Sequence, residues 1–143
     1  MDYNFFIKKA KQFDSRNEFG HYEDVQNLPL ELQEFYATAN PLDVEMILDG
    51  VNLKFCPAEE LEDLRQEYQL PDECIIFATQ NADPVFLLNH KVYSTMAGHY
   101  KPEFICDSFD DFLKNLWFKY TNSIILFYSK NWSWAINIKE IYQ

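Results

Sequence analysis

Carboxylates are the side chains of this sequence that could do chemistry, because 23 acidic residues stand against 12 basic ones. Carboxylates can transfer protons during catalysis, or they can attract a basic binding partner. They gather in three places. One dense run holds Glu59, Glu60, Glu62 and Asp63, and a second group around an Asp-Gly pair holds Asp43, Glu45 and Asp49. A single acid, Asp83, precedes a proline.

Spacing gives these carboxylates no catalytic role, because no nucleophile, base and orienting group can be named from the order of residues. The histidines at positions 21, 90 and 99 show no HExxH or similar spacing. No metal site is therefore predicted, and we expect these histidines in exposed loops or turns.

Cysteine and glycine usage gives no sign of a cofactor, a disulfide framework or a zinc site. Cys56, Cys74 and Cys106 are odd in number and include no CxxC pair. We expect buried free thiols in a reducing compartment. Only three glycines occur, so the sequence contains no glycine-rich phosphate loop and no cofactor is predicted.

The formal net charge of −11 restricts the partners of this protein. Phosphate backbones and anionic lipids repel such a chain, so we expect no direct binding to nucleic acid or membrane. A basic protein partner would be attracted, although acidity can also serve solubility alone.

Each acidic group accordingly has two interpretations. The run from Glu59 to Asp63 is either a solvated helix face or a patch that meets lysine or arginine on a partner. The same alternatives hold for the group from Asp43 to Asp49. Asp83 is either a turn residue that bonds its own backbone, or an acid that lines a cleft and contacts the partner.

Length and composition predict a single domain over residues 1–143. Hydrophobic residues make up 48% of the chain and aromatic residues 17%, which is enough for a core. The first residues have the wrong charge order for a secretory signal. The longest purely apolar run, from Ile124 to Tyr128, is too short to span a bilayer. A cytoplasmic location is the expectation.

The elements that position these carboxylates follow from hydrophobic period and from turn residues. Between Leu28 and Pro41 the apolar residues share one helix face, and the Asn40-Pro41 pair ends the helix. Asp49-Gly50 between two alternating runs predicts a hairpin. An apolar run at 74–79 predicts a buried central strand. Helices are also expected after Asp2, after Pro57 and after Ser108, strands at 44–48, 51–55, 85–88 and 92–94, and loops at 14–27 and 96–106.

This order predicts an α+β fold with a single mostly antiparallel sheet and about four helices. The tail from about residue 121 has an ambiguous pattern. Trp132 and Trp134 would share a face in a strand but not in a helix, and Trp117 is equally unassigned. Exposed tryptophans there would be anchors for a partner.

Five pieces of the sequence follow one another in a recognisable order: Leu28-Pro29 with Phe35 and Asn40, the run 58–61, the strand 76–78, the turn and strand 83–87, and the helix start 108–113. Together they resemble the SUKH superfamily, which includes bacterial immunity proteins and the yeast Smi/Knr-type regulators of glucan synthesis. Two turn positions depart from the family pattern, because Pro41 and Ala82 stand where glycine is usual, and we expect the local turns to differ.

The resemblance implies an α+β fold and a non-enzymatic role. Bacterial members are mostly inferred to bind and neutralise toxins, often nucleases, inside the producing cell, and an acidic surface suits a basic nuclease. One alternative is a regulatory or scaffold protein of cell-wall synthesis. The other is a small enzyme with an acidic cleft near Asp83 and His99.

Overall fold

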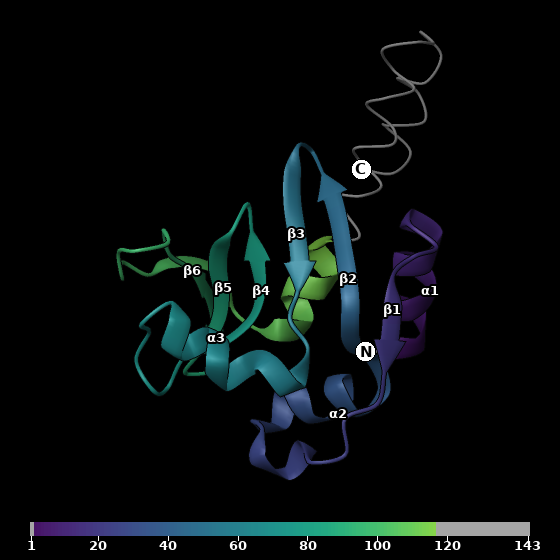
Figure 1. Ribbon diagram of the computed structural model, residues 1–143, viewed down its shortest axis with the longest axis horizontal. Helices are drawn as coiled ribbons and strands as arrows, with labels where there is room; N and C mark the ends of the chain where they lie inside the picture. The colour runs from purple at the N-terminus through teal and green to yellow at the C-terminus, as the bar shows by residue number, and fades with distance from the viewer. Residues whose placement is uncertain (1, 117–143) are drawn as a thin grey trace, which may run out of the picture.

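A computed structural model describes residues 2–116 of the chain (Figure 1). Within these residues seven strands form one antiparallel sheet in chain order, so each strand pairs with its neighbour in the sequence, which confirms the predicted α+β fold. The strands are β1 (Glu18–Gly20), β2 (Asn40–Leu48), β3 (Val51–Phe55), β4 (Ile75–Gln80), β5 (Asp83–Leu88), β6 (Lys91–Ser94) and β7 (Glu103–Cys106). The helices are α1 (Tyr3–Phe13), α2 (Leu30–Ala39), α3 (Leu61–Glu67) and residues 109–116, with 3-10 turns η1 (Val25–Asn27) and η2 (Ala58–Glu60). The expectations for the tail and its tryptophans lie outside the described residues.

Helices lie on both faces of this sheet. In the view of Figure 1, α3 crosses in front of the sheet beside β4 and β5, and the helix at 109–116 lies behind it. The upper parts of β2 and β3 have no helix in front of them (Figure 1). We call this uncovered front side of β2 and β3 the outer face.

Aromatic side chains form the centre of the core. Phe35 of α2 is fully buried, and its ring contacts Phe6, Phe55 and Phe109 at centroid distances of 5.4, 6.3 and 4.9 Å. The contacts with Phe6 and Phe109 are edge-to-face, an arrangement that the ring quadrupoles favour. The core therefore joins α1, α2, β3 and the last described helix. The predicted stripe on that helix is buried as expected: Phe109, Phe112, Leu113 and Leu116.

The predicted caps of α1 and of the helix at 109–116 are confirmed. The helix expected after Pro57 begins instead with the 3-10 turn η2, and α3 starts only at Leu61. The side chain of Asp2 accepts a hydrogen bond from the backbone N–H of Asn4, and Ser108 Oγ accepts from the N–H of Asp111 at 3.0 Å. α2 begins directly after Pro29, and Asn40 takes extended backbone angles and opens β2. The Asn40-Pro41 pair thus converts a helix directly into a strand, because the residue before proline avoids the helical region.

Three tight turns connect the hairpins, and each holds two residues with positive φ. Asp49 and Gly50 join β2 to β3 with φ of 53° and 77°, as predicted. Asn81 and Ala82 join β4 to β5, and Asn89 and His90 join β5 to β6. Ala82, with φ of 71°, therefore keeps the backbone conformation that glycine favours at this position.

Two segments expected to be loops contain regular structure. Residues 14–27 include β1 and η1, and residues 96–106 end in β7. Both strands lie at the edges of the sheet and are three and four residues long. A period of two cannot be recognised over so few residues, so the sequence pattern could not predict them.

Candidate functional site

Four exposed side chains follow one another along the outer face of β2. Leu42, Asp43, Glu45 and Ile47 are all exposed, whereas Val44 and Met46 between them are fully buried. The register between β1 and β2 shifts beside Glu18, where Leu42 is the extra residue, and such a bulge turns two neighbouring side chains outward. Strand alternation then places Glu45 and Ile47 on the same side. We call these four residues the β2 outer row.

Neighbouring strands add charge to the β2 outer row. Glu18 of β1 stands directly opposite Asp43, and Lys54 of β3 stands opposite Glu45. Like charges directly opposite each other repel, so the Glu18–Asp43 pair favours a cation that comes between them. The Glu45 carboxylate also accepts a hydrogen bond of 2.6 Å from the side-chain amide of Asn52.

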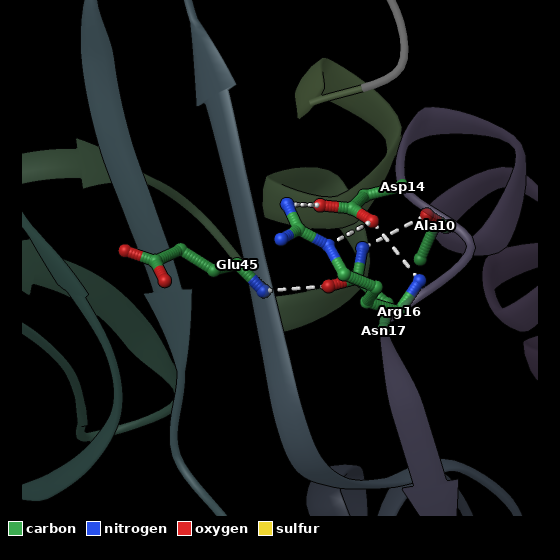
Figure 2. Close-up of polar contacts among 5 residues, drawn as sticks. All are labelled: Ala10, Asp14, Arg16, Asn17 and Glu45. Carbon is green, nitrogen blue, oxygen red and sulfur yellow. Dashed lines mark hydrogen bonds and ion pairs between the residues drawn. The ribbon is translucent and has the colours of Figure 1, made fainter.

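Asn17 fixes the position of this strand relative to α1. It is a buried polar residue, and Figure 2 shows its amide group between the backbones of Ala10 and Glu45. Its Nδ2 donates to the Ala10 carbonyl at 2.9 Å, and its Oδ1 accepts from the Glu45 N–H at 3.0 Å. The Glu45 carboxylate points away from this contact (Figure 2). One amide thus links the end of α1 to the middle of β2.

Arg16 lies beside Asn17, and its guanidinium is ion-paired with Asp14. Its guanidinium bonds both carboxylate oxygens of Asp14, at 3.1 and 2.9 Å (Figure 2). This hydrogen bonding lowers the pKa of Asp14 to about 2. The bond to Asp14, and more weakly the charge of Asp43, raise the pKa of Arg16. Because Arg16 is held by Asp14, it leaves the Asp43 carboxylate accessible to a partner.

The acidic run on η2 and α3 contains two carboxylates that are already hydrogen-bonded within the protein. Glu59 accepts a hydrogen bond of 2.8 Å from the buried side chain of Asn40, and Asn40 also accepts from the N–H of Ala58. Glu62 is bonded to Arg65, which lowers the pKa of Glu62 to about 2. Glu59 and Glu62 are thus already bonded, although all four side chains of the run are exposed.

Asp83 anchors a loop. Its carboxylate accepts the backbone N–H of Ala97 at 2.9 Å, and Thr95 closes the same loop by bonding the backbone of His99 and Lys101. The bond runs to a loop 14 residues away rather than to its own turn. Asp83 therefore holds a distant loop in place, whereas one of its two sequence interpretations expected a bond to its own turn.

An apolar hollow of about 450 Å³ lies at the tip of the β2–β3 hairpin. Leu48, Val51 and Leu53 form one wall, and Phe112 and Leu116 form the other. Asp49 and Gln80 are among its few polar lining residues, and neither Asp83 nor His99 lines it. This hollow is thus not the acidic cleft expected near those two residues.

The described cysteines and histidines form no further site. Burial raises the pKa of the Cys56 thiol to about 12, so this thiol is neutral at physiological pH. Cys56, Cys74 and Cys106 are all buried, as predicted. His21 and His90 are exposed, and each ring bonds one acceptor, the Ala37 carbonyl and the Glu31 carboxylate. Within residues 2–116 no three His, Cys, Asp or Glu side chains converge as metal ligands.

No protein-family model matches this chain, and the comparison with curated proteins also found no match. The part of the chain that the structure describes contains no helix that is long and apolar enough to cross a membrane.

The sequence identified Asp43 and Glu45 but missed the residues that complete their surface. Leu42 and Ile47 are 44% and 63% exposed. The buried face predicted for strand 44–48 is confirmed, but its exposed face was expected to be polar. Ile47 could have been found, because it is out of phase with Val44, Met46 and Leu48. No periodic pattern marks Asn17 or Glu18, because both belong to residues 14–27, where a loop is expected from the sequence.

Proposed function

We propose that this protein is a non-enzymatic binding module that holds a basic protein partner on the β2 outer row, in the manner of a toxin immunity protein. The observation that supports this proposal is the row itself, in which two large apolar side chains flank two carboxylates on an uncovered sheet face. Apolar anchors supply binding energy, and charges around them supply rate and specificity.

The resemblance of the sequence to the SUKH superfamily supports the same role. A nuclease toxin carries basic residues around a phosphate-binding site, and Asp43 and Glu45 complement such a surface. Binding there would cover the toxin and block access of nucleic acid. The toxin would be met inside the producing cell, which fits the cytoplasmic location that we propose for this chain.

The proposal predicts that a neighbouring reading frame encodes a toxin domain, and the test is co-expression of the two chains. We expect protection of the cells, a stable complex of the purified proteins, and an association rate that falls as salt rises. The double variant Asp43→Asn/Glu45→Gln should lower the association rate at least fivefold at low salt. Glu23→Gln/Asp24→Asn removes two exposed charges from the loop before η1 and is the matched control.

Two results would count against this proposal. A toxin that neither binds the chain nor is neutralised by it would remove the immunity role. A complex whose rate falls equally in both double variants would show that total charge, and not the β2 outer row, attracts the partner.

A further inference from the structure

The edge of β2 that follows Asp43 has no strand partner among the described residues. β2 pairs with β1 through Asn40–Asp43 on one side, and with β3 through Val44–Leu48 on the other side. In an antiparallel sheet, consecutive residues direct their backbone groups to opposite edges. The N–H of Glu45 points toward Asn17, on the side of β1. Ile47, two residues further, therefore directs its N–H and C=O to the same edge.

Protection of this edge stops at Glu45. Sheet edges are normally guarded by proline, bulges, charges or covering groups, because unpaired backbone groups recruit other strands. On β2, Pro41, the bulge at Leu42 and the side chain of Asn17 supply this protection in turn. None of the described residues forms a hydrogen bond with the backbone of Ile47 on that side.

The opposite edge of the sheet is better guarded. β7 follows directly after Lys101 and Pro102. The ammonium of Lys91 lies 5.9 Å from the ring centroid of Phe104 and 3.9 Å from Asp107. Lysine and proline at an edge discourage strand pairing. Lys101 and Pro102 thus disfavour strand pairing at β7, whereas Val44–Leu48 of β2 contains neither lysine nor proline.

We propose that the partner adds a short extended strand to β2 at Ile47, and that this strand carries lysine or arginine beside Asp43 and Glu45. This inference rests on the proposed function and names the mode of contact. Main-chain hydrogen bonds to Ile47 give the strand its register. Its outward side chains then meet the carboxylates and the exposed Ile47 side chain, as cross-strand neighbours do. Charge complementarity selects a basic segment over an acidic one.

A synthetic peptide tests the edge without the natural partner. The probe is a capped seven-residue peptide of alternating lysine and valine, and the control replaces lysine by glutamate. At about 150 mM salt, we expect the basic peptide to slow amide hydrogen exchange at Ile47 about tenfold, and the acidic peptide to leave it unchanged. An Ile47 amide that is already protected in the free protein overturns the proposal, because this chain would then cover its own edge.

Two substitutions at one position separate the backbone from the side chain. Ile47→Pro removes the outward N–H and leaves the bonds to β3, so we expect about tenfold weaker peptide binding. Ile47→Thr keeps the N–H and should bind within about threefold of the native chain. Equal affinity of Ile47→Pro and the native chain overturns the proposal. Circular dichroism checks folding, and if Ile47→Pro does not fold, the exchange measurement on the native chain decides.

The two proposals fail in different ways. A toxin complex weakened by Asp43→Asn/Glu45→Gln but unaffected by Ile47→Pro would preserve the binding function and reject strand addition. A toxin complex insensitive to all of these substitutions would reject the β2 outer row as the binding surface, and both proposals with it.

Discussion

At the scale of single residues, Asn40 joins two elements whose relative position the binding surface requires. It is fully buried at the start of β2, and it bonds Glu59 and the N–H of Ala58 through its side chain. Removing the side chain leaves the Ala58 N–H buried without its partner. We therefore expect Asn40→Ala to lower the free energy of unfolding by about 2–3 kcal/mol.

Urea denaturation measures this loss, and Asn52→Ala is the matched control. Asn52 also bonds a glutamate, Glu45, but it is exposed, so water replaces the lost bond. The control should cost less than about 1 kcal/mol. If both variants lose the same stability, burial of Asn40 is not what makes its hydrogen bonds important.

Residue types also set how much of the surface the sequence could reveal. Asp43 and Glu45 were found because acidic residues alternate with apolar ones around Asp49-Gly50. The roles of Glu59 and Asp83 could not be predicted, because their partners, Asn40 and the N–H of Ala97, are distant in the sequence. Charge patterns show which residues are ionised but not which of them are already bonded.

At the scale of elements, the hairpin turns contain a strained position. Ala82 has a φ of 71°, where a side chain is costly and glycine is favoured. We expect Ala82→Gly to raise the free energy of unfolding by about 0.5–1 kcal/mol, because relief of strain exceeds the added entropy of the unfolded chain. Thermal and urea denaturation measure the gain.

The same substitution in a helix is the control for this turn. Ala37 lies inside α2, where Ala37→Gly should lower stability by about 1 kcal/mol. Opposite signs at the two positions are expected. A loss of stability at both positions would mean that the Ala82 side chain contributes contacts that outweigh its backbone strain.

Elements with strong local signals were predictable, and those that depend on distant partners were not. Capping residues, prolines and the Asp-Gly pair set the limits of α1, α2 and the β2–β3 hairpin within the sequence itself. β1 exists because β2 lies beside it, and β7 exists because β6 does. The open edge at Ile47 follows from where β1 ends, so no pattern within β2 could have revealed it.

At the scale of the whole molecule, charge is distributed unevenly along the chain. Residues 2–116 hold 22 of the 23 acidic residues but only nine of the 12 basic ones. The folded part therefore concentrates negative charge in a small volume, and this self-repulsion disfavours the compact state. The same negative electrostatic field would attract a basic partner, so the net charge affects both stability and binding.

Salt should consequently stabilise this protein at neutral pH. Raising sodium chloride from about 10 to about 300 mM shortens the Debye length and screens the repulsion between carboxylates. We expect the melting temperature at pH 7 to rise by roughly 2–4 °C, which corresponds to about 1 kcal/mol for a domain of this size. At pH 4.5, close to the sequence pI, the net charge is near zero and the rise should disappear. Differential scanning calorimetry at both pH values checks this. An equal rise at pH 4.5 would mean that salt acts on apolar burial instead of on the charge that we assign to partner attraction.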